Sequence, residues 1–554
     1  MKKIMKKKMS AIVAAVCTAA LIGCGAGTPS ADPHGGSDTD SFYTESDHTE
    51  NDSTESSHAE SGPDADDTAS QIVPIVPPDT ESVAASEEFR SFLNWEEDTN
   101  EEKVYNIFCP DEEFMRIVAR CCDTYEAEDR TESVIDDSTV TDPQSSESAE
   151  EKSSETFYYG RIGTAEIRWI ICHEIGERYL TSLDLSLIDE SDSNNVTDLY
   201  IVDAADVQKY VEPEFQAAMP LIRDAGLPTG DLSAQYGYTR RLGSGDDGVQ
   251  RAVSLGITPG VFMYDRQAAL DVLGSDDPEV VQAGVADWET FEATAAKAGE
   301  KGWAMLSDWT DSFDAFAVGV SGDWLTETGA VKIDDALRAW TEQSELFMKK
   351  GYYSKGEGQV FGTFITADEI MDLALSAEAD DLTGKYGLCA GPTGWYRGGR
   401  FIVVNSLCDQ RSLTKKILEE IVFDRDVQRE LKAEGLIPNS RDVLPEKAEK
   451  SSGGISAADS DSHAEESQGT DASAPDSHAG AIEIVTEFFG GQDPYQVFAE
   501  AADRVVLGNV SVFDAYLCDM YGREFSAYFA GEKDRDSAMR VFYTEVSDLI
   551  SEED

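Results

Sequence analysis

The chain has 554 residues and a formal net charge of −65 at pH 7, with 44 Lys and Arg against 109 Asp and Glu. This excess of acid argues against nucleic acid as a partner, because phosphate binding needs clustered Lys and Arg. Three acidic tracts, at residues 25–80, 126–156 and 451–480, hold too few apolar residues to fold and are predicted to be disordered. The remaining residues, about 420, are enough for two or three domains with real cores.

The N-terminus predicts export. Five lysines precede a short apolar run, residues 11–22, which ends in Leu21-Ile22-Gly23-Cys24. Such a run is typical of a signal peptide, because crossing ~30 Å of hydrocarbon takes about 20 apolar residues. The Leu-Ile-Gly-Cys ending resembles the bacterial lipobox, which implies that residues 1–23 are removed and that Cys24 is lipidated; the alternative is a secretory signal with an incidental cysteine. We therefore expect a protein outside the cytoplasmic membrane that is tethered to it by acyl chains.

Seven further cysteines remain in the body, an odd number with no CxxC pair. Most are expected to be small buried apolar residues. Cys109 and Cys172, on strands predicted to be neighbours, form the pair that deserves the first test for a disulfide.

Short β-rich runs alternate with amphipathic helices along the body. The predicted strands are residues 104–108, 166–172, 198–202, 260–264 and 400–404. Helical spacing links Ile333, Ala336, Leu337 and Trp340, and again Ile417, Leu418, Ile421 and Val422. Asp277-Pro278 and Asp493-Pro494 predict helix starts with an Asp cap. Strands that alternate with helices indicate α/β lobes with mainly parallel sheets.

Six segments follow one another in a recognisable order. They are residues 104–114, 198–204, 252–264, 385–405, 435–443 and 529–539. Among them are Val-Tyr-Asn-Ile-Phe at 104–108, Pro-Gly-Val-Phe-Met-Tyr at 259–264 and Gly-Leu-Ile-Pro-Asn at 435–439. In this order they resemble the extracellular solute-binding lipoproteins of ABC sugar importers (family 1), over residues 102–445 and 481–554.

The resemblance implies a two-lobe, periplasmic-binding-protein-like fold of class II, with hinge crossings and a ligand cleft between the lobes. It implies the following order: a lipidated Cys and acidic linker at 24–101, lobe I at 102–254 and 391–445, lobe II at 255–390 and 481–554, and disordered inserts at 126–156 and 446–480. The chain departs from the family's pattern at Pro110-Asp111 and Leu255, where sugar binders often carry aromatic residues. These departures leave the substrate open.

The strongest predicted ligand patch is Trp395-Tyr396-Arg397, flanked by glycines that permit a cleft loop. Its alternative is a hairpin tip packed on the lobe surface. Trp309 and Asp311 combine an aromatic face with a carboxylate, and their alternative role is helix capping. Other candidates are strand-end residues, where open α/β sheets bind ligands; Tyr264 could equally face the core. They are Asp111, Glu112, Asp203, Asp206 and Tyr264.

Two motif matches carry no function. Gly243-Ser244-Gly245-Asp246-Asp247-Gly248 fits GxGxxG, but a strand is predicted after it instead of the helix that a pyrophosphate site needs. His173-Glu174-Ile175-Gly176-Glu177 looks like half of a zincin signature, but the second histidine is absent. His173 is the one histidine outside the acidic tracts, so no histidine-based metal site or catalytic triad is expected. We expect neither a cofactor nor a metal.

The sequence therefore predicts a monomeric, membrane-anchored binding protein, not an enzyme. It would capture a carbohydrate, in particular an oligosaccharide, and pass it to the transmembrane subunits of an ABC permease. The alternatives are a surface glycoside hydrolase that uses paired carboxylates such as Asp308 and Asp311, and an orphan or sensory binding lipoprotein.

Overall fold

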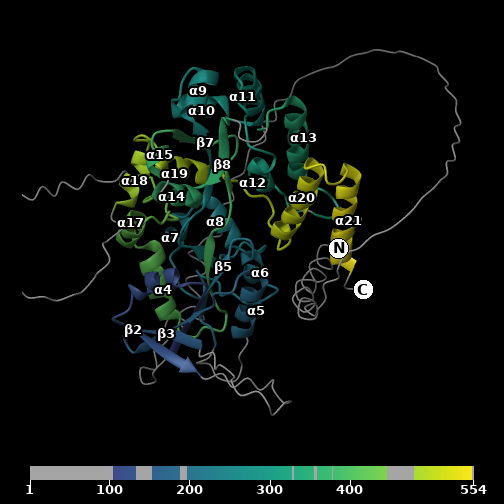
Figure 1. Ribbon diagram of the computed structural model, residues 1–554. Coiled ribbons are helices and arrows are strands. Elements are labelled where there is room, and N and C mark those ends of the chain that lie inside the picture. The colour runs from purple at the N-terminus through teal and green to yellow at the C-terminus, as the bar shows by residue number, and fades with distance from the viewer. Residues whose placement is uncertain are drawn as a thin grey trace, which may run out of the picture. The chain divides into compact units, whose positions relative to one another are not determined.

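The computed structural model describes residues 104–132, 153–187, 196–322, 324–326, 330–354, 359–376, 379–445 and 480–551. The predicted export signal, Cys24 and the linker up to residue 101 lie outside these residues, as do 133–152 and 446–479 of the acidic inserts. The described strands form two sheets (Figure 1).

The larger sheet has seven strands in the order β2-β3-β4-β1-β5-β11-β6. β1 pairs in parallel with β4 and β5, whereas the other neighbours are antiparallel. We call this sheet and the helices packed on it lobe I. Its strands are β1 (Val104–Cys109), β2 (Thr124–Glu132), β3 (Ser153–Ile162), β4 (Ala165–Ile171), β5 (Leu199–Asp203), β6 (Ala252–Ser254) and β11 (Arg400–Val404).

Lobe I is covered on both faces because its central strands are apolar on both faces. Along β5, Leu199 and Ile201 enter one buried cluster, and Tyr200 and Val202 enter the other. The first face packs against α4 (Glu112–Ala119), α7 (Thr229–Ser233), α16 (Arg411–Leu418), the π-turn η2 (Glu419–Phe423) and α17 (Arg425–Ala433). The second packs against α5 (Glu177–Ser186), α6 (Val207–Val211) and α8 (Gly237–Leu242).

The smaller sheet is built around β7, which pairs antiparallel with β8, β9 and β10. We call this sheet and its helices lobe II. Its strands are β7 (Pro259–Asp265), β8 (Gly362–Thr366), β9 (Tyr386–Cys389) and β10 (Trp395–Tyr396). Its helices are α9 (Arg266–Leu273), α10 (Pro278–Gly284), α11 (Trp288–Lys301), α12 (Phe313–Ala317) after the short η1 (Thr310–Ser312), α13 (Asp335–Lys350), α14 (Ala367–Leu375), α15 (Ala379–Leu382), α18 (Ala481–Phe488), α19 (Pro494–Arg504), α20 (Asp514–Phe529) and α21 (Arg535–Ser551).

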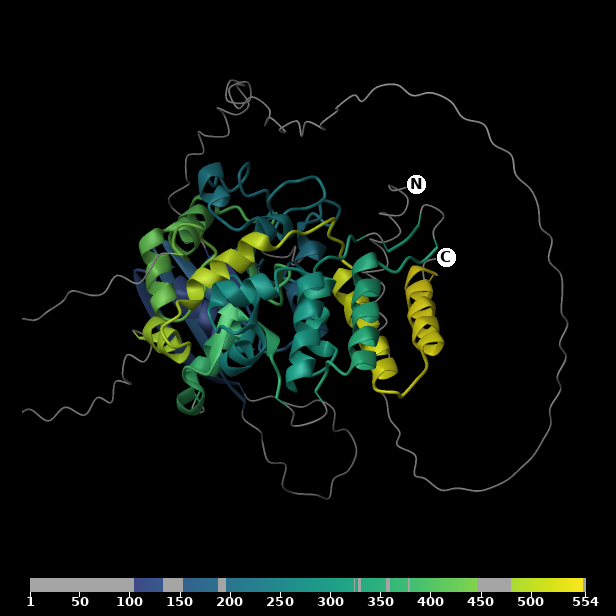
Figure 2. The ribbon, with the colours of Figure 1, turned by 90° about the horizontal axis from the view of Figure 1, so that it is seen from above.

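The C-terminal helices α20 and α21 lie side by side and extend the lobe II core next to α13 (Figure 2). Buried rings hold them together, with Trp340 of α13 against Tyr521 of α20, and Tyr521 against Phe542 of α21. Burying each large ring contributes roughly 1.5–3 kcal/mol. This packing fixes the position of the first turns of α20, which line the candidate site described below.

The described chain passes between the lobes at residues 255–258, from β6 to β7, and at residues 397–399, from β10 to β11. The sequence placed the return at residue 391. The return comes later because β10 still pairs with β7, through Trp395 opposite Gly260 and Tyr396 opposite Pro259.

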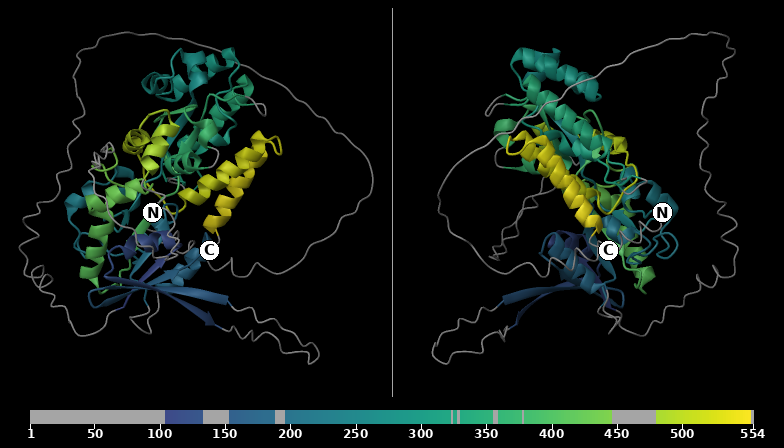
Figure 3. Two further views of the ribbon diagram at one scale, coloured as in Figure 1. Left: turned by 60° about the vertical axis from the view of Figure 1, so that its left-hand side comes forward. Right: turned by 90° about the vertical axis from the view of Figure 1, so that its right-hand side faces the viewer.

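Two expectations are corrected. The sheets are not mainly parallel, because the crossings bring distant segments into each sheet antiparallel to their neighbours. The tract at 126–156 is also not disordered throughout, since β2 reaches Glu132 and β3 begins at Ser153 (Figure 3). Backbone hydrogen bonds hold these two arms in register, and such bonds need no apolar side chains.

All seven cysteines of the body are free. Cys109 and Cys172 do lie on neighbouring backbone, where the Cys172 N–H donates to the Cys109 carbonyl at 2.9 Å, but no disulfide joins them. Among the described helices, none combines the length and the apolar character that a bilayer span requires.

Candidate functional site

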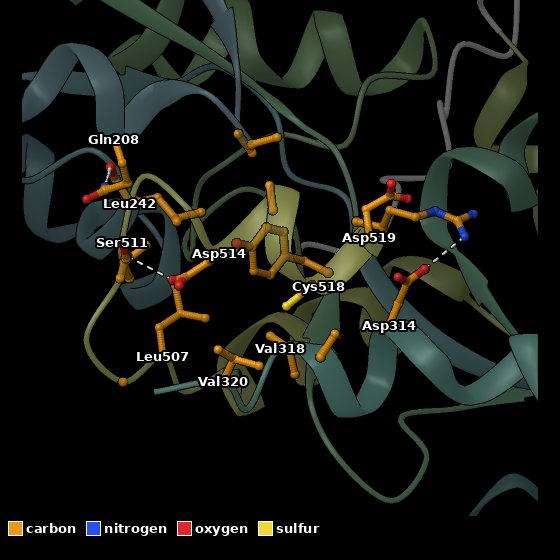
Figure 4. Close-up of a pocket in the computed structure, with 18 of the residues that line it drawn as sticks. Gln208, Leu242, Asp314, Val318, Val320, Leu507, Ser511, Asp514, Cys518 and Asp519 are labelled. Atoms are coloured by element: carbon orange, nitrogen blue, oxygen red, sulfur yellow. Dashed lines mark hydrogen bonds and ion pairs between the residues drawn. The ribbon is translucent and has the colours of Figure 1, made fainter. Parts of the chain in front are cut away.

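A cavity of about 320 Å³ lies between the lobes beside the crossing at residues 397–399 (Figure 4). Lobe I contributes the end of β5 and helices α6 and α8, and lobe II contributes α12, the segment 507–511 and the first turns of α20. The crossing forms part of the wall. The volume is at the lower end of the range for small-molecule sites, so the space suits a small solute. Its polar lining side chains are Gln208, Asp314, Arg397, Asn509, Ser511, Asp514 and Asp519.

Asp514 begins α20 and is a partly buried carboxylate of the cavity. Its Oδ1 accepts a hydrogen bond from Trp324 Nε1 at 2.7 Å, and its Oδ2 accepts one from the Ser511 N–H at 2.8 Å. Burial raises the pKa of Asp514 to about 6, although these two hydrogen bonds oppose the shift. Within the described residues, no Lys, Arg or His nitrogen lies within 4.0 Å of this carboxylate.

Arg397 joins two helices of lobe II at the cavity wall. Its Nη1 donates to Asp314 Oδ2 of α12 at 3.0 Å, and its Nη2 donates to Glu369 of α14. Burial still raises the pKa of Asp314, because loss of hydration outweighs the attraction of the guanidinium. Both terminal nitrogens of Arg397 are therefore already engaged with carboxylates.

The aromatic residues of the predicted ligand patch divide between two environments. Trp395 is 1% exposed and packs in the lobe II core against Gly260, where any Cβ would clash with the indole. Tyr396 lines the cavity and stacks on Tyr238 of α8 in lobe I, with ring centroids 5.0 Å apart. The patch thus supplies a cavity wall through Tyr396 and Arg397, while Trp395 anchors the strand.

The strand-end carboxylates lie on lobe I near the crossing but do not line the cavity. Asp111 caps α4 and pairs with Arg400 at 2.6 Å. Glu112 lies 3.7 Å from His173 Nε2. Loss of hydration raises the pKa of Asp203 and of Asp206, and Arg400 opposes the shift at Asp203. Of the β5 end, only the two alanines that follow Asp203 reach the cavity wall.

Three further candidates have mainly local contacts. Asp311 accepts hydrogen bonds from the Ser307 N–H at 2.7 Å and from Thr363, so it closes its own loop. Trp309 packs on rings of lobe II, including that of Phe529. Tyr264 is fully buried, and its hydroxyl donates to the Asp276 carbonyl. Of its two alternatives, the ring takes the core side.

Sequence reasoning missed Gln208, Tyr238 and Asp514. None lies in a recognisable motif, and residues 208 and 514 are brought together only by tertiary packing. The Ser511 to Asp514 spacing is a weak N-cap signal that could have marked the start of α20.

The described residues contain no cluster of three or more His, Cys, Asp or Glu side chains arranged to hold a metal ion. The GxGxxG match at 243–248 forms a turn, closed by a bridge between Ser244 and Gln250, and leads into β6 and not into a helix. It therefore lacks the helix N-terminus that a pyrophosphate needs.

No protein-family model and no curated protein matches the chain. Solved structures do. A crystal structure of an extracellular solute-binding protein of family 1 matches with a TM-score of 0.54 and 13% identity, over 70% of this chain and 93% of that one. The cyclic alpha-maltosyl-1,6-maltose binding protein from Arthrobacter globiformis has a TM-score of 0.49 and 14% identity, over 82% and 100%. The GacH receptor of Streptomyces glaucescens has a TM-score of 0.47 and 12% identity, over 81% and 99%. The first of these likenesses shows that the chain has the two-lobe fold of an extracellular solute-binding protein.

Proposed function

We propose that this protein captures a carbohydrate between its two lobes and delivers it to the transmembrane subunits of an ABC permease. The observation that carries the proposal is the cavity beside the crossing, whose walls come from both lobes. A solute held there contacts both lobes together only when they are close. Binding would therefore shift an open–closed equilibrium towards the closed state, as in hinged binding proteins.

The lining supports a polar solute with apolar faces. Carboxylate and amide oxygens accept hydrogen bonds from hydroxyl groups, while the Phe313 and Tyr396 rings and aliphatic side chains such as Val318 can pack on C–H faces. A sugar ring has both kinds of surface. The fold adds to this argument, because it is shared with a solute-binding protein.

Membrane anchoring is part of the proposal. Cys24 would carry the lipid, and the acidic linker at 24–101 would hold the lobes away from the anionic leaflet on the extracellular face of the membrane. In this arrangement the protein acts as a monomer beside its permease.

The glycoside hydrolase alternative is weaker. It needs two carboxylates that are free to face a scissile bond, one as acid and one as base or nucleophile. Asp311 is held by Ser307 and Thr363, and Asp308 accepts from the Thr310 N–H at 2.8 Å. Both carboxylates are engaged in shaping their own loop, which favours binding over hydrolysis.

Thermal unfolding with a panel of mono- and oligosaccharides, short peptides and amino acids tests the proposal. A true ligand at a hundredfold excess over its Kd should add about 2.7 kcal/mol of stability, and small-angle scattering should show a smaller particle. The saccharide should be recovered unchanged. Stabilisation by peptides alone would exclude carbohydrate capture, and cleavage of the saccharide would indicate the hydrolase.

A further inference from the structure

The charged groups at the cavity do not balance. Three carboxylates line it, those of Asp314, Asp514 and Asp519, and the one lining cation among the described residues is Arg397. Arg397 is shared between Asp314 and Glu369, so it is already neutralised. Asp519 is exposed and lies 4.0 Å from Arg523. Lobe I adds no charged side chain to the wall. Asp514 therefore accepts hydrogen bonds from neutral donors alone, while Arg241 of α8 acts on it electrostatically from beyond 4.0 Å.

The cavity-lining side chains also offer more hydrogen-bond acceptors than free hydrogen-bond donors. Gln208 is 2% exposed; its Nε2 donates to the Leu242 carbonyl at 2.6 Å, while its Oε1 has no hydrogen-bond partner. Figure 4 shows Gln208 and Asp514 among the side chains around the cavity, on lobe I and lobe II respectively. An unpaired buried acceptor is unfavourable, because it has lost its hydrogen bonds to water and gained none in the protein. A solute that donates to Gln208 would remove this cost.

These two features select for one kind of group. A hydroxyl brings an acceptor oxygen with each donor, and the lining has few free donors to satisfy it. An ammonium group brings three donors, no acceptor and a positive charge that can pair directly with Asp514. The Tyr396 and Phe313 rings on the same wall are also compatible with a cation.

We propose that the cavity selects a solute that carries a protonated amino group, with the Asp514 carboxylate as its counter-ion and Gln208 Oε1 as a second acceptor. This inference rests on the proposed function and narrows it, since it makes the carbohydrate an amino sugar with a free amine. N-acetylation of the amine should abolish the preference, because it removes both the charge and two of the donors.

The test compares matched solutes on the full chain by calorimetry at pH 7. They are glucosamine, N-acetylglucosamine and glucose, the corresponding β-1,4 disaccharides, and putrescine as an amine without a sugar. The amino sugars should bind at least tenfold more tightly than their N-acetylated and neutral counterparts, and the affinity should fall as salt rises. Asp514→Asn should reduce that preference about tenfold or more. Glu483→Gln, on an exposed position of α18, makes the same charge change outside the cavity and should leave it unchanged.

The outcomes separate the two proposals. If neutral or N-acetylated sugars bind as tightly as amino sugars, the ammonium inference is wrong and carbohydrate capture stands. If putrescine binds through Asp514 and no sugar does, the ammonium inference stands and carbohydrate capture is wrong. If no solute of the panel binds, the ammonium inference is overturned. The comparison on the unsubstituted chain remains decisive even if Asp514→Asn fails to fold.

Discussion

Tyr238 and Tyr396 stack across the lobe boundary, with ring centroids 5.0 Å apart and an interplanar angle of 28°. Tyr238 belongs to α8 of lobe I, and Tyr396 belongs to β10 in the sheet of lobe II. This contact lies directly before the crossing at 397–399. It therefore joins Tyr396 of the cavity wall to lobe I next to this crossing.

A double-mutant cycle should detect the interaction between the Tyr238 and Tyr396 rings. We expect Tyr238→Leu and Tyr396→Leu, singly and together, to give an interaction free energy of about 0.5–1.5 kcal/mol in denaturant unfolding, because leucine keeps much of the apolar volume but removes the ring stack. Strictly additive effects would show that the stack contributes nothing beyond burial.

Gly260→Ala should be one of the most damaging single substitutions in lobe II. An added Cβ would lie 1.9 Å from Trp395 Cε2, and Trp395 is buried and cannot move aside. We expect a loss of about 3 kcal/mol or more in the free energy of unfolding. Gly237→Ala is the matched control, because nothing lies within 4 Å of its added Cβ. Equal stability of the two variants would contradict the packing of Trp395 on β7.

Asp198 should make stability fall as pH rises. Burial is the largest cause that raises its pKa to about 6, with Asp409 adding to the shift and the hydrogen bond from the Asn106 N–H opposing it. The folded state holds the Asp198 proton more tightly than the unfolded state. Below pH ~4 the carboxyl group is protonated in both states, so its titration does not change the free energy of unfolding. Its contribution then falls by about 3 kcal/mol between pH ~4 and pH ~6 and is constant above.

Asp198→Asn keeps an oxygen for the Asn106 N–H and removes the titration. The difference in unfolding free energy between variant and parent should therefore grow in favour of the variant from pH 4 to pH 6 and then level off. Asp536→Asn, at an exposed position of α21, controls for the loss of one charge. A difference that does not change with pH would contradict the burial of the Asp198 carboxylate.

Arg397→Gln should alter binding more than stability. The Arg397 side chain is half exposed, and such ion pairs contribute roughly 0–1 kcal/mol, so the melting temperature should change little. The substitution frees Asp314 and Glu369 and makes the cavity still more negative. Neutral sugars should bind less well, whereas an amine should bind as well or better, as calorimetry can measure. A large loss of stability would instead show that Arg397 is a structural clamp between α12 and α14.

Cys24→Ala should release the protein from the membrane fraction. The expected lipid is joined to the Cys24 thiol, and alanine offers no sulfur for it. Mass spectrometry of the mature N-terminus should find a diacylglyceryl-modified Cys24 in the parent. An unmodified secreted protein that begins elsewhere would favour the ordinary secretory signal.

The sequence alone determined several of the elements and the two-lobe α/β fold class. The run at 400–404 and the Asp caps before Pro278 and Pro494 were predicted correctly, because β-branched runs and cap residues act within a few residues of chain. The order of segments predicted the two-lobe architecture, which the solved structure with a TM-score of 0.54 supports.

Only the tertiary structure decided where the cavity lies and what lines it. Gln208 carries no local signal and Asp514 only a weak N-cap signal, and they line one cavity because packing of α13, α20 and α21 places the start of α20 opposite α6. Likewise, Trp395 and Tyr396 are adjacent in sequence, yet the alternation of side chains along a strand sends one into the core and the other to the cavity. Local patterns do not encode such contacts, because they depend on which distant surfaces the folded chain brings together.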